Sequence, residues 1–356
     1  MRIAVVADPY IPIPPTLYGG IERIVAFLVG SLHDRGHEVT LIAHPDSTIR
    51  CAELVSYGRP PHAGIVLRTA ELLQVQRALC ARVHRIDLIH SFGRLAGLLP
   101  LLPVRSVPKI QSYQRAVSWP GIVRAACLGG SSLVFTACST AVYAHRPQSA
   151  RRHGSWLTIG NGVELQKYVG VESVADDAPL VFLGQLHPMK GPHVAIRIAQ
   201  AAGRRIVLAG TPEPGPKGRE FFEQTIAPEL GPDVEYLGAV DDAQKSALLG
   251  RAAALIFPSF YDEAFGIVMA ESMACGTPVI GFDNGSVPEV LRHGHTGFVC
   301  RNEAEAVDAV GRLGTIDRGE VRRECAARFG STVIVDAYER LYRAMRDRLD
   351  RPSMAA

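Results

Sequence analysis

The sequence predicts an α/β fold made of two domains, in each of which strands and helices alternate along the chain. Its 356 residues exceed what one hydrophobic core normally serves. A series of strand, glycine-containing loop and helix begins at Ile3, and a second series begins at Leu180. The polar stretch Glu172–Pro179 lies between them and is interpreted as a linker. We therefore expect two Rossmann-like, doubly wound domains, residues 1–170 and 171–330.

The first series starts with Ile3–Ala7, an apolar run typical of a buried strand. A proline-rich loop then ends at Gly19 and Gly20, and apolar residues at helical spacing predict a helix over Ile21–Arg35. Trp156–Ile159 is interpreted as the exit from this domain. The other expected elements are strands Val39–Ala43, Asp87–His90, Lys109–Ser112 and Leu133–Ala137, and helices Thr69–Arg82, Leu95–Leu102 and Ile122–Leu128.

The second series repeats this alternation and is followed by one long helix. Its expected strands are Leu180–Leu183, Arg205–Ala209, Val234–Leu237, Ala254–Phe257, Pro278–Phe282 and Gly297–Val299. Its expected helices are Val194–Ala202, Phe221–Leu230, Asp241–Leu249, a short one from Val287, and Glu303–Leu313. The last helix, Thr332–Leu349, has one apolar stripe and one face dense in arginine, which favours a packing helix over a membrane-surface helix. We expect residues 331–356 to cross back to the first domain.

Composition limits the classes of partner and compartment. Residues 1–170 hold 18 Lys and Arg against 9 Asp and Glu, whereas the remainder holds 20 against 26. A basic first half suggests an anionic partner, and the lack of interleaved aromatic residues argues against nucleic acid. The 7 Cys include no Cys-x-x-Cys pair, and no apolar run is long enough to span a membrane. We expect a cytoplasmic protein, with peripheral contact to the inner face of a membrane left open.

The stretch Glu263–Glu271 is the strongest candidate for a functional site. It follows the strand Ala254–Phe257 and continues into a helix that is expected to stop at Gly276. Phe265 to Val268 should form the first helical turn, whose unpaired N–H groups favour an anion. Glu263 should lie on the loop at the carboxyl end of the strand, and Glu271 should project from the helix towards the crevice beside that loop. The competing interpretation is a strand-to-helix turn whose acids are only solvated.

Lys190 supplies a cation at the same edge of the second sheet. It follows a strand and a loop that contains Gly184, and a helix comes after it. An ammonium together with a helix N-terminus suits a diphosphate leaving group. Neither a Gly-x-x-x-x-Gly-Lys-Ser/Thr loop nor an Asp-rich cluster is present, so we expect no metal requirement.

Four polar residues stand at or just after the carboxyl ends of strands of the first domain and are further candidate site residues. Ligands of parallel sheets bind at the carboxyl ends of strands, so these side chains should line a crevice. A structural, fully bonded His90 is an equally open interpretation. The four residues are His90, Arg94, Gln114 and Arg115.

The motifs together resemble the retaining glycosyltransferases of family 4, which have the GT-B architecture of two Rossmann-like domains with a cleft between them. The pair Glu263 and Glu271 followed by Gly276-Thr-Pro-Val279 is the most specific match. The supporting matches are Tyr18-Gly19-Gly20, Arg35-Gly36-His37, Gly160-Asn161-Gly162, Gly184 to Gly191, and Gly285 to Glu289.

The resemblance implies a role for each matched position. Glu263 would contact the donor sugar, and Lys190 would neutralise the diphosphate, both serving catalysis. Glu271 would accept hydrogen bonds from the ribose, and the loop after Gly210 would lie near the base. The implied donor-binding set is Gly19, Gly20, Gly184, Gln185, Lys190, Gly210, Thr211, Glu263, Phe265, Gly266, Ile267, Val268 and Glu271.

Two positions depart from the family pattern. Gln185 stands where members usually carry an arginine, and the loss of one charged contact costs about 1.5–3 kcal/mol unless another group compensates. The resemblance also makes His90, Arg94, Gln114 and Arg115 the acceptor-side candidates. Gln114, or a neighbour, stands where many members carry a histidine, so Arg115 or His90 would have to take over the contact to the acceptor.

The expected activity is transfer of a sugar from a nucleoside diphosphate sugar to an acceptor hydroxyl, with the anomeric configuration retained. Uridine is favoured as the base over guanosine, and no cofactor is required beyond the donor. The acceptor is a polysaccharide, a lipid-linked intermediate or a small natural product. The alternatives are an epimerase or hydrolase of the same fold, a phosphorylase, and a sugar-nucleotide-binding protein without turnover.

Overall fold

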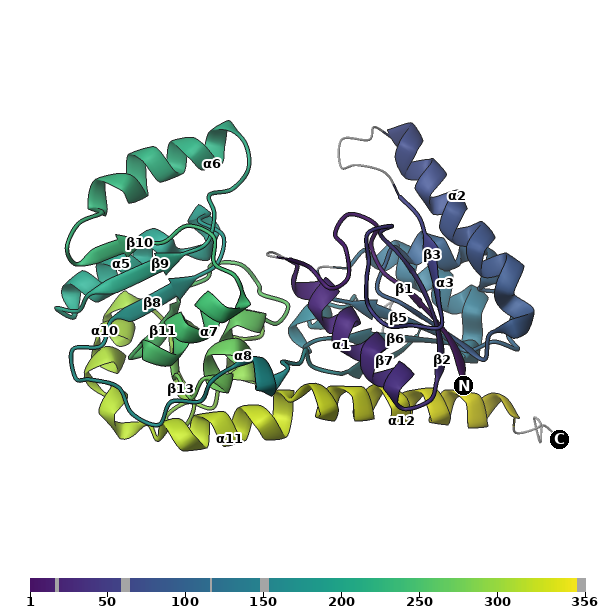
Figure 1. The fold of residues 1–356 in the computed structure, drawn as a ribbon. Helices are drawn as coiled ribbons and strands as arrows, with labels where there is room; N and C mark the ends of the chain where they lie inside the picture. The colour runs from purple at the N-terminus through teal and green to yellow at the C-terminus, as the bar shows by residue number, and fades with distance from the viewer. Residues whose placement is uncertain (17–18, 59–64, 116, 148–153, 351–356) are drawn as a thin grey trace. The chain divides into compact units, whose positions relative to one another are not determined.

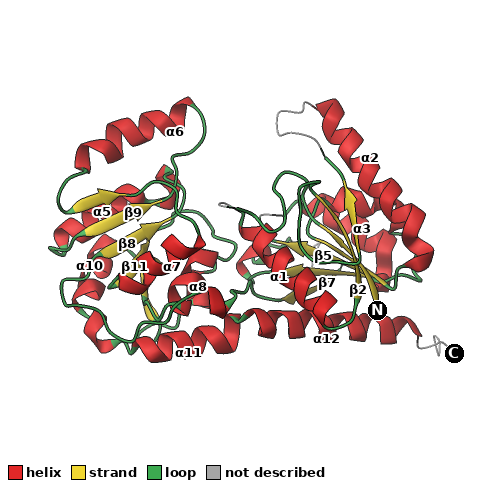
Figure 2. Cartoon of the chain, viewed as in Figure 1, coloured by secondary structure: helices red, strands yellow, loops and turns green. Residues whose placement is uncertain are grey.

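The chain forms two compact units. The computed structural model describes residues 1–16, 19–58, 65–115, 117–147 and 154–350, so Tyr18 and residues 351–356 lie outside the described part. Unit 1 comprises Met1–Asn161 together with Ser331–Ala356, and unit 2 comprises Gly162–Gly330 (Figure 1). Each unit contains one sheet flanked by helices (Figure 2). The two α/β series predicted from the sequence are thereby confirmed.

The sheet of unit 1 is parallel throughout its described strands. Their order is β3-β2-β1-β4-β5-β6-β7. The chain builds strands on one side of β1 first and then continues on the other side from β4, so the order reverses between β1 and β4. The strands are β1 (Arg2–Val6), β2 (Glu38–Ala43), β3 (Glu53–Ser56), β4 (Leu88–Ser91), β5 (Lys109–Tyr113), β6 (Leu133–Ala137) and β7 (Ser155–Thr158).

Helices cover both faces of this sheet. Successive strand residues point to opposite sides, so each strand contributes side chains to both faces. Ala4 and Val6 of β1 pack in one core cluster with Val75 and Leu79 of a helix on one face. His90 of β4 faces the opposite side, where the last helix lies. The helices are α1 (Gly20–Asp34), α2 (Ile65–Arg82), the 3₁₀ segment η2 (Leu95–Leu101), α3 (Trp119–Gly129) and α12 (Ser331–Asp350).

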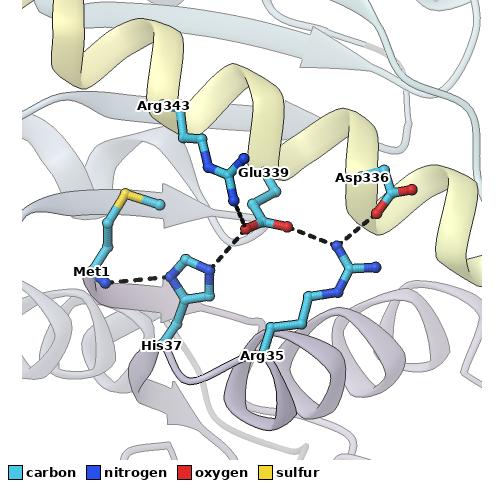
Figure 3. Close-up of polar contacts among 6 residues, drawn as sticks. All are labelled: Met1, Arg35, His37, Asp336, Glu339 and Arg343. Atoms are coloured by element: carbon cyan, nitrogen blue, oxygen red, sulfur yellow. Dashed lines mark hydrogen bonds and ion pairs between the residues drawn. The ribbon is translucent and has the colours of Figure 1, made fainter.

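Helix α12 belongs to unit 1 although it comes last in the chain, and it packs beside α1. Its buried side includes Ile334, Tyr338 and Met345, as the apolar stripe predicts, and also Tyr342. Polar contacts add to this packing at the amino end of the sheet (Figure 3). The Glu339 carboxylate accepts bonds from Arg35 at 2.7 Å and from His37 at 3.2 Å, and it also contacts Arg343. Asp336 of α12 pairs with Arg35 at 2.6 Å.

Unit 2, all of whose residues are described, contains a parallel sheet of the order β10-β9-β8-β11-β12-β13. The order reverses between β8 and β11, as it does between the corresponding strands of unit 1. The strands are β8 (Leu180–Leu183), β9 (Ile206–Ala209), β10 (Val234–Tyr236), β11 (Ala254–Phe257), β12 (Val279–Phe282) and β13 (Gly297–Cys300). The helices are α5 (Pro192–Ala201), α6 (Pro216–Phe221), α7 (Asp242–Arg251), α8 (Ile267–Ala274), α9 (Val287–Val290), α10 (Glu303–Gly311) and α11 (Arg318–Phe329).

Several elements differ from the sequence-based expectation. Strand β3 and helix α11 were not predicted: β3 is a short edge strand without a buried face, and α11 buries few of its many charged residues. The segment interpreted as the exit from the first domain, Trp156–Ile159, lies almost wholly in the edge strand β7, which was not predicted as a strand, and the first segment of unit 1 ends soon after it, at Asn161. The helix expected over Phe221–Leu230 begins earlier, at Pro216, and then passes through a π turn over Phe222–Ile226.

Candidate functional site

The polar residues of unit 2 gather where the strand order of its sheet reverses. Strands β8 and β11 are adjacent and parallel, so their carboxyl ends lie at one edge of the sheet. Ligands of open α/β sheets bind at such a reversal because the following loops diverge and leave a crevice. The loop after β8 carries Lys190 and the loop after β11 carries Glu263. This edge is therefore the candidate site.

Lys190 and Glu263 are in direct contact. The Lys190 ammonium pairs with Oε1 of Glu263, and the Ser259 hydroxyl donates to the same oxygen at 2.9 Å. The side chains are 29% and 12% exposed, so the lysine remains within reach of a ligand. Its ammonium also lies 5.4 Å from the centre of the Tyr261 ring. The pairing confines a partly exposed positive charge to the edge of the sheet.

Two glycines let the supporting loops approach closely. Gly191 has φ +75°, and a Cβ there would lie 2.5 Å from the carbonyl oxygen of Pro258. Gly285 has φ +55°, and a Cβ there would lie 2.4 Å from the backbone nitrogen of Glu263. Phe260 N–H donates to the carbonyl of Met189 at 2.8 Å and joins the two loops. The position of the Lys190–Glu263 pair is thus fixed by the backbone on both sides.

Glu271 has two partners that the sequence did not suggest. Its side chain is 5% exposed, and Oε1 accepts bonds from Lys245 at 2.5 Å and from the Tyr168 hydroxyl at 2.8 Å. A buried cation therefore neutralises this carboxylate. Sequence reasoning missed Lys245 and Tyr168. The available signal was that Lys245 shares the buried face of α7 with Leu248 and Leu249, where an unpaired lysine is rare.

The glycine-containing loops after β8 and β9 lie side by side. A Cβ on Gly210 would lie 1.8 Å from the carbonyl oxygen of Gly184, so this approach requires glycine. Leu186 N–H donates to the carbonyl of Thr211 at 2.8 Å. These contacts bring Gly184, Gln185, Gly210 and Thr211 together at the same edge of the sheet.

Helix α8 begins later than expected, which is a correction to the predicted first turn. Gly266 precedes it with φ +67°, a left-handed conformation that cannot belong to the helix. The first turn therefore starts at Ile267 and includes Val268. Phe265 is instead buried, with its ring edge-on to Phe329 at 5.4 Å between centroids. Its side chain packs in the core of unit 2.

In unit 1, two of the acceptor-side candidates lie at the reversal between β1 and β4. Arg94 follows β4 and donates to the Tyr10 hydroxyl at 2.8 Å. Arg115 follows β5 and donates to Oδ2 of Asp8 at 2.6 Å. Both arginine side chains are exposed. The structure therefore places both guanidinium groups, through Tyr10 and Asp8, beside the loop that follows β1.

His90 is fully buried. Its Nδ1 lies 2.6 Å from the Tyr342 hydroxyl and its Nε2 lies 2.6 Å from Oγ of Ser112. Burial lowers the pKa of this imidazole to about 3. Of the two interpretations that the sequence left open, the geometry favours the structural one.

The remaining candidates of unit 1 have mixed surroundings. Both amide atoms of Gln114 are buried without a hydrogen-bond partner in the described part of the chain. Gly19 is packed against the Pro15 ring, and Gly20 begins α1.

The described residues contain neither a metal-binding cluster nor a membrane-spanning helix. Within them, no group of three or more His, Cys, Asp and Glu side chains could hold a metal ion. In that same part of the chain, each helix is too short or too polar to cross a membrane.

Comparison with protein families matches most of the chain. Residues 18–156 match the model of glycosyltransferase family 4, and residues 171–326 match the model of glycosyl transferases group 1. A D-inositol 3-phosphate glycosyltransferase of Mycobacterium tuberculosis (strain ATCC 25618 / H37Rv) is 33% identical over 164 residues, which are 44% of this chain and 34% of the relative. The aligned part thus spans about a third of the length of such curated relatives.

Solved structures of similar fold cover nearly all of the chain. AviGT4, a glycosyltransferase involved in avilamycin A biosynthesis, is 27% identical with a TM-score of 0.70, and the match covers 97% of this chain and 98% of that one. Anabaena HepE in complex with UDP-glucose is 18% identical with a TM-score of 0.73, covering 97% of this chain and 100% of that one. The sucrose-phosphate synthase of Thermosynechococcus elongatus is 20% identical with a TM-score of 0.77, covering 97% and 98%.

Proposed function

This chain belongs to glycosyltransferase family 4 and has the GT-B fold, and on that premise we propose that it transfers a sugar from a nucleoside diphosphate sugar to an acceptor hydroxyl with retention of anomeric configuration. The observation that carries the proposal is the contact between Lys190 and Glu263 at the strand reversal of unit 2. It supports the proposal because a cation of the kind that suits a diphosphate lies next to a carboxylate of the kind that suits sugar hydroxyls.

Lys190 serves the leaving group. As the bond between the anomeric carbon and the phosphate oxygen breaks, negative charge develops on the diphosphate. An ammonium that is already oriented stabilises this charge without reorganisation at the moment of reaction. Glu263 and Ser259 hold the ammonium in position. The backbone N–H groups at the start of α8 add partial positive charge at the same edge.

The acceptor attacks the anomeric carbon on the same face of the sugar from which the diphosphate departs. Its hydroxyl oxygen forms the new bond to the anomeric carbon, and its proton passes to the departing phosphate oxygen. The side chains of the site then align the reactants or neutralise the charge of the diphosphate, and none of them becomes covalently bound to the sugar. Alignment of two reactants is worth about 7–11 kcal/mol in favourable cases.

Glu271 is proposed to hold the ribose. The two hydrogen bonds described above end on Oε1, and Lys245 balances the charge of this carboxylate. Oε2 is then assigned to the ribose hydroxyls, and Gly210 and Thr211 to the neighbourhood of the base. Gly19 and Gly20 are kept as proposed contacts of the diphosphate. Uridine is the preferred base, in line with the UDP-glucose bound to HepE.

One observation favours a second candidate, a sugar-nucleotide-binding protein without turnover. Gln185 supplies no charge where family members usually have an arginine, so the diphosphate would meet Lys190 as its main cation. Product analysis decides between transfer, binding alone, and epimerisation or hydrolysis of the donor. Transfer predicts a glycoside that appears only with acceptor, whereas rapid epimer or free sugar without acceptor supports the rival enzymes.

The direct test of the assignment is Glu263→Ala, with Asp262→Ala as the matched control. Asp262 is the adjacent exposed carboxylate. We expect Glu263→Ala to lower the rate of transfer about a hundredfold or more, because the sugar and Lys190 both lose their partner. The control should retain the wild-type rate. Equal rates in wild type and Glu263→Ala would refute the role.

A further inference from the structure

Unit 1 has a small hollow at its own strand reversal, between the carboxyl ends of β1 and β4. Its volume is about 20 Å³, and its lining includes Asp8, Tyr10, Glu71 and Arg94. Tyr57 also lines it, but its hydroxyl donates to the carbonyl of Ala7. A space of this size holds one water-sized group. The fold therefore repeats in unit 1 the position that Lys190 and Glu263 occupy in unit 2.

Glu71 of α2 is the unusual residue of this hollow. It is 5% exposed, and Oε2 accepts a hydrogen bond from the Tyr10 hydroxyl at 2.9 Å. Oε1 is buried and has no partner among the described residues. A buried acceptor without a partner destabilises the fold, and more so when it carries charge. Oε1 can therefore accept a hydrogen bond from a donor outside the chain.

The neighbouring groups determine the chemistry of that donor. The Arg94 guanidinium donates to Tyr10, whose hydroxyl in turn donates to Glu71, so the arginine acts on the carboxylate through the tyrosine. Asp8 is engaged by Arg115 at 2.6 Å. Asp8 and Glu71 line the hollow together with Arg94, whose guanidinium donates to Tyr10. A phosphate or carboxylate ligand at Oε1 of Glu71 would therefore bring two anions into contact. A neutral O–H group fits both the size and the charge.

We propose that the hollow is a subsite for one hydroxyl group of a neutral, polyhydroxylated acceptor, which donates to Oε1 of Glu71. The proposal rests on the proposed function, since it assigns the acceptor class of the same reaction. It also revises the expectation drawn from the basic first half of the chain. The net charge of residues 1–170 suggested an anionic partner, whereas the buried carboxylate favours a sugar or cyclitol hydroxyl.

Saturation-transfer NMR on the full chain tests the inference without knowledge of the natural acceptor. The neutral probes are D-glucose, D-mannose, D-galactose and myo-inositol, and the anionic probes are glucose 6-phosphate, mannose 6-phosphate and myo-inositol 1-phosphate. Each is measured at millimolar concentration with wild type, Glu71→Ala and Glu71→Gln. Gln76→Ala serves as the control on the same helix, where its amide donates to the carbonyl of Ala96. UDP binding is measured on every variant.

We expect at least one neutral probe to bind wild type and Gln76→Ala equally, and to bind both Glu71 variants about tenfold more weakly. UDP affinity should be the same in all variants. The inference is overturned if no neutral probe binds wild type, if Glu71→Gln is folded and binds as wild type does, or if a phosphate binds more tightly than its neutral counterpart. If UDP does not bind to wild type at all, the proposed function itself is refuted.

Discussion

The ammonium of Lys190 contacts the carboxylate of Glu263 although 73 positions separate the two residues in the chain. Each follows one of the two adjacent strands at which the order of the second sheet reverses. The contact follows from topology, since parallel neighbours deliver their following loops to the same edge. It gives the molecule a cation and an acid at the place where α/β sheets bind ligands.

The buried pair Lys245 and Glu271 should be costly to break from one side. Lys245→Met leaves a carboxylate that is 5% exposed without its cation, and we expect a loss of about 3–5 kcal/mol in the free energy of unfolding. Urea denaturation measures this loss. The double variant Lys245→Met, Glu271→Gln should recover most of it, because no unpaired charge remains at position 271 and the second partner of Lys245, Asp242 at 3.4 Å, is 34% exposed. A single variant as stable as wild type would show that the pair is not neutralising a buried charge.

Gly285→Ala should impair activity by moving the backbone of Glu263. The new Cβ would lie 2.4 Å from the Glu263 nitrogen, and a shift of about 1 Å at a catalytic group can cost roughly a hundredfold in rate. Gly294→Ala is the matched control, because Gly294 has a similar φ of +77° but nothing within 4 Å of the new Cβ. Steady-state kinetics are measured on both variants. Both introduce an alanine with positive φ, but only Gly285→Ala should displace Glu263 and lower the rate of transfer. Equal activity of the two variants would contradict the proposed contact.

The attachment of α12 should depend on pH through Glu339 (Figure 3). Burial opposes ionisation of this carboxyl, but hydrogen bonds from Arg35 and His37 outweigh it and hold its pKa below the ordinary value of 4.5. The stabilisation is therefore present above pH 4.5 and is lost as the pH falls through the lowered pKa. We expect the free energy of unfolding of wild type to exceed that of Glu339→Gln by about 1–3 kcal/mol at neutral pH.

Denaturant unfolding at several pH values measures this difference. It should shrink as the acid range is entered, whereas Asp347→Asn, on the exposed side of α12, should differ little from wild type at any pH. A difference between wild type and Glu339→Gln that is independent of pH would contradict the assignment.

His90 should remain neutral in the folded protein over the physiological range. Burial lowers its pKa to about 3, below the ordinary value of 6.5. Its contribution to stability is therefore present above pH 6.5 and is lost as the pH falls from 6.5 towards 3. Imidazole NMR shifts of folded His90 should not change between about pH 8 and 5, whereas the urea-unfolded chain should titrate near 6.5. A titration of the folded imidazole in that interval would contradict a structural role.

Much of the second sheet and its site could be predicted from the sequence. Strands β8 and β11 have the predicted bounds because continuous apolar runs between polar loops leave little choice. Lys190 and Glu263 were placed at one edge for the same reason. The charge partner of Glu271, in contrast, could not be predicted: its pairing with Lys245 depends on the packing of α7 against α8, which no local pattern encodes.

The acceptor side was less predictable for a related reason. Arg94 and Arg115 follow strands and could be found by position. Glu71 lies on a helix, and its burial follows from the approach of α2 to the loop after β1, a contact between distant segments. His90 was ambiguous, since only the return of α12 to unit 1 supplies the Tyr342 hydroxyl that engages it.

Calorimetric titration of UDP tests the central claim most directly, with wild type, Lys190→Ala and Lys217→Ala. Lys217 is an exposed lysine of α6 in the same unit, so its replacement removes the same charge from unit 2 without removing a residue assigned to the donor. The account predicts that wild type and Lys217→Ala bind UDP with the same affinity, and that Lys190→Ala binds it about tenfold or more weakly because a charged contact is lost. The account would be contradicted if UDP failed to bind wild type, or if Lys190→Ala bound UDP as tightly as Lys217→Ala.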